Sequence, residues 1–460
     1  MASHVIAHWN PEDKSAWDQT GHSVAQRNLW LSIPALTLAF AVWMVWSVVV
    51  VNLPVVGFKY STNQLFWLAA LPALCGATLR IFYSFAVPIF GGRRWTAIST
   101  ASLLLPALGI GFAVQNPATP YEAMVALALL CGLGGGNFAS SMANISFFFP
   151  KAQKGYALGM NAGLGNLGVS IVQFVVPLVI TAGVFGGLGG EAATVTKAGQ
   201  TSSMWLQNAG FVWVPFIAAS AAAAWFGMDD LADARAGFSE QAVIFTRKHN
   251  WLMCWLYLGT FGSFIGFSAG LPMLIQSQFL RDDLPLLAWL GPLIGALLRP
   301  LGGWLADRFG GGRITFWSFV VMALGVAAVL PCLPQAGHGG SFPGFLAAFG
   351  VLFAASGIGN GSSFRMIPSI FVAERQRSAE PLPTAQAQAT KDGNVEAAAV
   401  LGFASAIGAY GGFFIPKSYG TSIAMTGSPA TALQLFFLFY LSCIALTWWH
   451  YSRRNAPMPC

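Results

Sequence analysis

Long apolar segments dominate the sequence, and they limit what the chain can fold into. Of its 460 residues 55% are hydrophobic and only 8% are charged, whereas a soluble domain carries about 25% charged residues. A helix that crosses a bilayer needs about 20 mainly apolar residues, and such segments recur along the chain. We therefore expect an all-α membrane protein with twelve transmembrane helices. The expected spans are residues 29–51, 63–90, 95–114, 121–149, 156–182, 204–226, 251–275, 284–305, 314–333, 342–372, 397–416 and 430–451.

Lysine and arginine are distributed unevenly over the ends of these spans. Sixteen of the 23 lie on one side and four on the other. Since basic residues collect on cytoplasmic loops, the crowded side is expected to be cytoplasmic, with both termini there. The net charge of +7 then reflects topology rather than nucleic-acid binding. The first 28 residues carry charges and no apolar core, so a cleavable signal peptide is not expected.

Charge also divides the chain into two halves. The longest charged stretch, residues 228–250, contains no span and is interpreted as a cytoplasmic linker. It separates two six-helix halves, residues 29–227 and 251–452, and polar cytoplasmic tails are expected at 1–28 and 453–460. A polar loop is expected between the tenth and eleventh spans.

One pattern occurs in both halves. Residues 76–96, GATLRIFYSFAVPIFGGRRWT, place Arg80 inside an apolar run, and residues 295–315, GALLRPLGGWLADRFGGGRIT, place Arg299 at the same point 219 residues later. An arginine near the bilayer centre costs roughly 2.5–3.5 kcal/mol even on the lenient insertion scale. Two arginines in matched positions therefore indicate one site built from both halves, and the expected ligand of two buried cations is an anion.

Acidic residues and histidines fall in tails, loops or helix ends, so neither arginine has an expected counter-ion at the same depth. The alternative is that the arginines bond to backbone carbonyls or polar side chains and only hold helices together. A guanidinium stays charged and offers a planar fork of donors, which suits a small planar oxyanion. Arg365 is expected near the cytoplasmic end of the tenth span, and the sequence assigns it no role.

Two glycine-rich segments, residues 159–168 and 402–411, correspond between the halves. Small residues let helices approach closely, and packing alone explains most of these glycines. Asn166 differs, because an amide in an apolar span needs a hydrogen-bond partner, either a backbone group or a substrate oxygen. Tyr257 and Phe261 lie on one face of the seventh span, where the tyrosine hydroxyl can donate to an anion. The glycines of interest are Gly159, Gly163, Gly165, Gly168, Gly402, Gly408 and Gly411.

Residues 303–313, GWLADRFGGGR, fit the cytoplasmic G-x-x-x-D-R-x-G motif of the major facilitator superfamily. Asp307 and Arg308 are its charged pair and are expected to act in gating. In the first half Pro88 stands where the acid would be, so the motif is degraded there. Two parallel six-helix halves joined by a central linker are the plan of that superfamily.

The six cysteines lie mostly inside apolar spans and show no metal-ligand spacing. They are interpreted as small free hydrophobic residues. We expect no metal, no cofactor and no enzymatic activity.

Several segments resemble the nitrate/nitrite porter family of the major facilitator superfamily, over nearly the whole chain. They are FGGRRWTA, NFASSMANISFFFPK, GLGNLGVS, TFGSFIGFSAG and GGFFIPKSYG. The resemblance implies that the two arginines grip the anion, that an amide and a hydroxyl hydrogen-bond it, and that two phenylalanines sandwich its flat face. The substrate-binding residues it implies are Arg80, Arg299, Asn166, Tyr257, Phe138 and Phe261.

This resemblance implies exchange of external nitrate for internal nitrite across a bacterial inner membrane, by alternating access. It further implies a monomer with a functional link to a cytoplasmic nitrate reductase and to nitrate assimilation. A nitrate/proton symporter is the alternative within the same class. An anion channel, or a membrane sensor that binds nitrate without moving it, is the alternative from another class.

Overall fold

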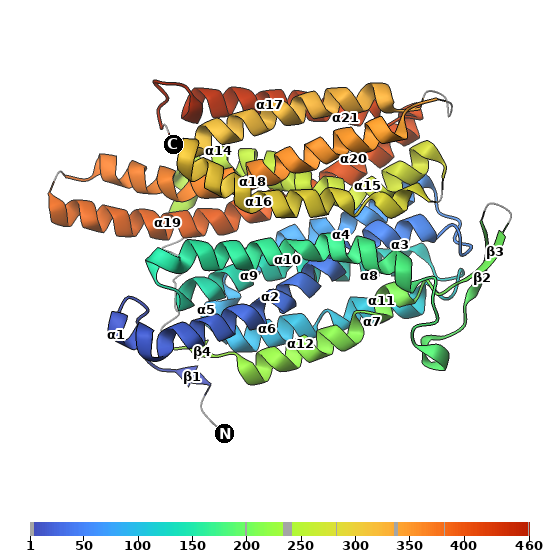
Figure 1. Cartoon of the computed structure of the whole chain (residues 1–460), viewed down its shortest axis with the longest axis horizontal. Coiled ribbons are helices and arrows are strands. Elements are labelled where there is room, and N and C mark those ends of the chain that lie inside the picture. Colours follow the sequence, from blue (N-terminus) through green and yellow to red (C-terminus); the bar gives the residue numbers. More distant parts are fainter. Residues whose placement is uncertain are drawn as a thin grey trace. The chain divides into compact units, whose positions relative to one another are not determined.

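A computed structural model describes residues 4–197, 200–232, 242–281, 283–334, 339–380, 382–458 and 460. The chain divides into two compact units (Figure 1). Unit 1 comprises Met1–Arg235 and Ser268–Trp289, and unit 2 comprises Ala236–Phe267 and Leu290–Cys460. Part of the expected linker, residues 233–241, lies outside the described residues, and the expected boundaries of the halves stay a prediction.

Unit 1 is built from the helices and strands up to Leu231, together with the later part of α15 and the short turn η5 (Leu284–Leu287). Its helices are α1 (Lys14–Ala16), α2 (His22–Met44), α3 (Trp46–Asn52), α4 (Thr62–Tyr83), α5 (Ala86–Phe90), α6 (Gly92–Ala101), α7 (Leu104–Ala113), α8 (Tyr121–Leu130), α9 (Gly132–Phe148), α10 (Lys151–Val179), α11 (Asn208–Phe211) and α12 (Val214–Gly227). Its strands are β1 (Val5–Ile6), β2 (Ala193–Lys197), β3 (Gln200–Met204) and β4 (Asp230–Leu231).

The strands mark the two ends of unit 1. β2 and β3 form an antiparallel hairpin between α10 and α11, with Ala193 opposite Met204. β1 pairs in parallel with β4, which follows α12. We call the two ends of unit 1 the hairpin end and the tail end (Figure 1).

The regular secondary structure of unit 2 is helical among its described residues. Its helices are α14 (Lys248–Tyr257), the first part of α15 (Ser263–Phe279), α16 (Leu290–Phe309), α17 (Gly311–Val329), α18 (Phe342–Ser378), α19 (Pro383–Ala409), α20 (Gly411–Thr426) and α21 (Ala430–Thr447). A π-helical turn, η4 (Leu258–Gly262), joins α14 to α15.

Twelve helical segments of the described residues are long and apolar enough to cross a membrane. They run from Lys14–Asn52 to Ala430–Ser452 and overlap the twelve expected spans in order. The prediction of an all-α membrane fold is confirmed. Their mean hydropathy, rather than any helix-start signal, made them recognisable in the sequence.

The segment between the tenth and eleventh spans is helical up to Ser378 and again from Pro383, so the expectation of a polar loop over its whole length was wrong. α18 continues to Ser378 and α19 begins at Pro383. Alanine, glutamine, lysine and glutamate all favour helix, although only alanine among them is apolar, and proline suits the first helical turn. Glu396, expected outside the helices, therefore lies inside α19 with only 4% of its surface exposed.

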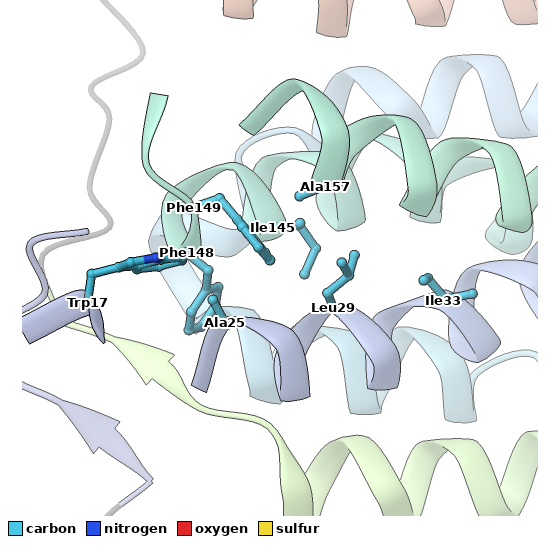
Figure 2. Packing of buried hydrophobic residues seen from close by; sticks show 8 residues of the cluster. All are labelled: Trp17, Ala25, Leu29, Ile33, Ile145, Phe148, Phe149 and Ala157. Carbon is cyan, nitrogen blue, oxygen red and sulfur yellow. The ribbon is translucent and has the colours of Figure 1, made fainter. Parts of the chain in front are cut away.

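The described N-terminal segment packs against the helices of unit 1. The Asp13 side chain accepts hydrogen bonds from two backbone amides of α1, so the first span begins at Lys14. Trp17 is buried, and its ring lies 6.0 Å from the ring of Phe149. Figure 2 shows how this apolar cluster joins the N-terminal segment to α2 and α9. Its members are Trp17, Ala25, Leu29, Ile33, Ile145, Phe148, Phe149 and Ala157.

In unit 1, α10 crosses α2 at a pair of glycines. A Cβ atom on Gly168 would lie 2.1 Å from the backbone oxygen of Thr37, and one on Gly165 would lie 2.7 Å from the side chain of Leu36. The Thr37 hydroxyl also donates to the Leu164 carbonyl at 3.2 Å. The close approach of the two backbones fixes the orientation of α10.

In unit 2, α16 crosses α18 in the same manner. A Cβ atom on Gly361 would lie 2.1 Å from the backbone oxygen of Arg299, and one on Gly302 would lie 2.1 Å from the backbone oxygen of Ile358. Backbone atoms cannot move aside as a flexible side chain does, so the crossing requires glycine. This crossing holds the segment of α16 that carries Arg299.

We predict that Gly168→Ala and Gly163→Ala have opposite effects on stability. The new methyl group would meet the Thr37 backbone oxygen at position 168, whereas nothing lies within 4 Å of a Cβ atom at position 163. Alanine also favours helix over glycine by about 1 kcal/mol. Thermal unfolding in detergent should show a lower midpoint for Gly168→Ala and an equal or higher one for Gly163→Ala. Equal midpoints for the two variants would contradict the packing argument.

Candidate functional site

Arg80 on α4 is fully buried in unit 1, and aromatic rings surround it. Its guanidinium carbon lies 5.0 Å from the ring centre of Trp43 and 4.7 Å from that of Phe138. Its Nε donates to the carbonyl oxygen of Gly135 at 2.8 Å. A cation over an aromatic face gains about 2 kcal/mol when desolvated. Arg80 is therefore held by one carbonyl and two rings from α2 and α9.

The glycines of α9 make this arrangement possible. A Cβ atom on Gly135 would lie 2.8 Å from the Cα atom of Gly76 and 2.6 Å from the Trp43 ring. The Trp43 indole in turn donates to the Pro72 carbonyl at 2.8 Å. Because α4 and α9 approach so closely, the Gly135 carbonyl comes within reach of the Arg80 side chain.

Asn166 on α10 is buried in unit 1, with 1% of its surface exposed. Neither its amide nitrogen nor its amide oxygen has a hydrogen-bond partner among the described residues. A buried polar group without a partner costs about 1–3 kcal/mol. Asn166 therefore keeps two buried hydrogen-bonding atoms for which the described residues supply no partner.

Arg299 on α16 is buried in unit 2, with 6% of its surface exposed. Its Nη2 donates to the Tyr257 hydroxyl at 3.4 Å, and its guanidinium carbon lies 5.5 Å from the ring centre of Phe364. Its Nη1 has no hydrogen-bond partner among the described residues. One arm of the planar guanidinium therefore has no acceptor among the described residues.

Tyr257 and Phe261 stand together as sequence spacing predicts. Their rings stack with centres 5.5 Å apart and planes at 25°, and both side chains are buried. A Cβ atom on Gly408 of α19 would lie 2.8 Å from the Tyr257 ring and 3.3 Å from the Phe261 ring. The glycine therefore lets the backbone of α19 pack directly against these two rings.

The structure groups the six expected binding residues by unit. Arg80 and Phe138 are in contact in unit 1, and Arg299, Tyr257 and Phe261 form one cluster in unit 2. Asn166 belongs to unit 1. Among the expected glycines, Gly165, Gly168, Gly408 and Gly411 lie at close approaches, whereas a Cβ atom at Gly159, Gly163 or Gly402 would meet nothing within 4 Å.

Arg365, to which the sequence assigned no role, pairs with the acid of the G-x-x-x-D-R-x-G motif in unit 2. Arg365 Nε donates to Asp307 Oδ1 at 2.5 Å, and both side chains are about half exposed. Arg308 lies over the ring of Trp304, with 5.6 Å between guanidinium carbon and ring centre. The Arg365 pair joins α18 to the end of α16.

Unit 1 replaces the missing acid of its own motif with a residue from elsewhere in the chain. Asp230 in β4 accepts from the backbone nitrogen of Arg93 at 2.8 Å and from its Nε at 3.3 Å, and Arg94 Nε lies 3.7 Å away. Gly91 has φ of 86°, and a Cβ atom there would lie 2.4 Å from Asp230 Oδ1. Sequence reasoning missed this pairing because 137 residues separate Asp230 from Arg93.

Glu396 is a second carboxylate whose surroundings the sequence did not predict. Its Oε1 accepts from Arg247 Nη2 at 3.0 Å and also from Arg375 Nη2. These partners come from the start of α14 and the end of α18. The alanine-rich sequence after Glu396 indicated helix and was the signal that it lies inside α19.

Comparisons with known proteins identify the class of protein to which this fold belongs. The sequence profile of the Major Facilitator Superfamily matches residues 35–379. A mutant of the nucleoside transporter NupG has a TM-score of 0.60 at 13% identity, over 92% of this chain and 98% of that one. A bacterial homologue of the lysosomal transporter Spinster has a TM-score of 0.59 at 14% identity, over 91% and 95%. At such identities these likenesses support the fold alone.

Relatives by sequence narrow the family. The chain is 50% identical to the nitrate/nitrite transporter NarU of Salmonella typhimurium, over 98% of this chain and 97% of that protein. NarU of Escherichia coli gives the same figures. A probable nitrate/nitrite antiporter of Thermus thermophilus, NarK2, is 42% identical over 99% and 98%. The chain belongs to the nitrate/nitrite porter family of the Major Facilitator Superfamily, and it is a multi-pass inner-membrane protein.

We predict that Asn166→Leu weakens binding of a planar monoanion while leaving the fold equally or more stable. The leucine removes two unpartnered polar atoms and, with them, the hydrogen bonds available to a ligand, each worth about 0.5–1.5 kcal/mol. Anion affinity should fall roughly tenfold, the equivalent of about 1.4 kcal/mol. The measurements are thermal unfolding and equilibrium binding to purified protein.

Asn161→Leu is the matched control on the same helix. The Asn161 amide donates to the Ser141 hydroxyl at 2.8 Å, so its loss should lower the unfolding midpoint. A lower midpoint for Asn166→Leu, with unchanged anion affinity, would mean that Asn166 serves packing only.

Proposed function

We propose that this chain is a carrier, not an enzyme, that binds nitrate and nitrite at a site formed by Arg80 and Arg299. The observation that carries the proposal is the recurrence of a buried arginine at the same point of both halves. Each arginine packs against aromatic rings. The names of the relatives support the choice of anion.

The side chains around the arginines favour a flat monoanion. A guanidinium presents two parallel N–H donors to an oxyanion, and the faces of Phe138 and Phe261 offer flat apolar walls. Asn166 and Tyr257 add an amide and a hydroxyl. Sulfate and phosphate are tetrahedral and carry more charge, so they suit this set of groups less well.

The orientation follows from the positive-inside rule. We propose that the tail end of unit 1, with Arg93, Arg94 and Asp230, faces the cytoplasm and that the hairpin end faces the opposite side. By the same rule, Asp307 and Arg375 lie near the cytoplasmic ends of α16 and α18.

Exchange of one anion for another is the mode of transport that these charges support best. Arginine stays protonated, so an empty site would enclose two positive charges, which is expensive in an apolar interior. A bound anion offsets part of that cost, and the loaded carrier therefore closes and switches more readily than the empty one. Nitrate and nitrite carry the same charge, so their one-for-one exchange is electroneutral.

Glu396 bears on the alternative of proton symport, because a symporter needs a group that gains and loses a proton during the cycle. Its negative charge is matched by two arginines, which suits a structural ion pair. We therefore favour exchange over symport. Uptake that continues at high rate without a counter-anion would favour the channel, and binding without any uptake would favour the sensor.

We predict that Arg80→Lys and Arg299→Lys each reduce nitrate transport by at least about 30-fold while the protein still inserts. Lysine keeps the charge but loses the planar fork, and a hydrogen bond to a charged group is worth about 1.5–3 kcal/mol. Arg313→Lys, at an exposed position, is the matched control and should transport normally. Near-normal transport by either buried lysine variant would show that charge alone suffices.

We predict fast nitrate uptake into proteoliposomes loaded with nitrite, little uptake into empty ones, and no acceleration by an inward proton gradient. The experiment compares initial rates for nitrite-loaded and empty vesicles, each with and without the gradient. Vesicles with Arg80→Lys protein measure the leak. Gradient-driven uptake into empty vesicles would reject exchange and support symport.

A further inference from the structure

Gln173 on α10 has no role in the site described above, yet it is placed to control access to it. It lies seven residues after Asn166, which is about 10 Å along the helix and almost the same angular position. Val169 lies between them on the same face. Gln173 and Val169 are both buried, with 3% and 0% of their surfaces exposed.

The Gln173 amide joins three helices of unit 1. Its Nε2 donates to the Ser47 hydroxyl of α3 at 3.0 Å and to the Ser268 carbonyl of α15 at 2.7 Å. Ser47 and Ser268 are themselves buried, with 1% and 0% of their surfaces exposed. Both amide hydrogens therefore bond α10 to α3 and α15 at one level of the helices. We call this contact of Gln173 with Ser47 and Ser268 the joint.

The residues next to Gln173 strengthen this joint. The Ser170 hydroxyl donates to the Trp289 carbonyl at 3.0 Å. The Phe174 ring meets the Trp289 ring edge-on, with centres 5.1 Å apart. α10 thus contacts both the first and the last residue of Ser268–Trp289, the segment that belongs to unit 1 although α15 begins in unit 2.

A cavity of about 320 Å³ lies on one side of the joint. Apart from Gln173 itself, its lining residues on α3, α10 and α15 all follow Ser47, Gln173 or Ser268 in sequence. The three helices run in the same direction across the expected membrane, so the cavity lies on the hairpin side of the joint. The lining residues that show this are Val48, Asn52, Pro177, Pro272 and Gln276.

We propose that Gln173 is the latch of the gate on the hairpin side, closing the route between this cavity and Asn166. The inference rests on the proposed function, in which the anion must reach its site from that side. Passage requires α3, α10 and α15 to separate at Gln173, and the two hydrogen bonds of its amide are what must break. Their re-formation restores the closed state.

The test measures access rather than transport. A cysteine is placed at Val169, on the Asn166 side of the latch, and a membrane-impermeant maleimide is added from the hairpin side. The full-length protein is reconstituted in vesicles, and the parent without Val169→Cys corrects for the native cysteines. With Gln173 intact the labelling should be slow, and with Gln173→Ala it should be at least about tenfold faster.

Gln173→Glu is a second variant with the same shape. A carboxylate cannot donate to the Ser268 carbonyl, so this variant should also label faster, even if alanine perturbs the fold. Gln207→Ala is the matched control. Gln207 is equally buried, and its Nε2 likewise donates to two acceptors, the carbonyls of Gly189 at 3.0 Å and Glu191 at 2.9 Å.

Faster labelling of both Gln173 variants from the hairpin side alone, with no change for Gln207→Ala, supports the latch. Unchanged labelling of the Gln173 variants overturns it, as does an equal rise for Gln207→Ala or from both faces of the membrane. The parent is assayed separately for nitrate exchange. If labelling responds while exchange is absent, the proposed function fails and the latch stands. If exchange is normal and labelling does not respond, only the latch fails.

Discussion

The cost of placing a guanidinium in an apolar span is the constraint on which the rest of the structure depends. Arg80 meets that cost with the Gly135 carbonyl and two aromatic faces. Arg299 meets it with the Tyr257 hydroxyl and the Phe364 ring, and leaves Nη1 without a partner among the described residues. In the proposed carrier, a bound anion adds to these contacts at each arginine.

Glycine contacts make these two environments possible. A carbonyl reaches Arg80 because α4 and α9 touch at Gly76 and Gly135, and α16 is held beside α18 by Gly361 against the Arg299 backbone. In a bilayer apolar side chains gain little by leaving lipid, so close backbone contact and hydrogen bonds must supply much of the packing energy. The same glycines therefore serve both stability and the position of the charges.

Hydropathy was enough to predict the all-α fold and its twelve spans, because each span must be apolar over its whole length. It could not predict α19, whose first half is polar, or the burial of Trp17, which depends on contact with Phe149. For the site, the repeat identified Arg80 and Arg299, and helical spacing placed Tyr257 beside Phe261. The pairing of Asp230 with Arg93 was not predicted, because only the fold brings these two residues together. The binding roles of all six residues stay predictions.

The charged pairs show that the two units form similar ion pairs from residues at different positions. Unit 2 keeps the acid of its motif, Asp307, and pairs it with Arg365. Unit 1 has Pro88 at that place and recruits Asp230, for which Gly91 leaves the room. Each unit thus has a carboxylate–guanidinium pair that follows its buried arginine in sequence, with Asp307 near the end of α16 and Arg93 at the start of α6. The pair in unit 2 is about half exposed whereas the pair in unit 1 is largely buried, so the two pairs differ in their surroundings as well as in their residues.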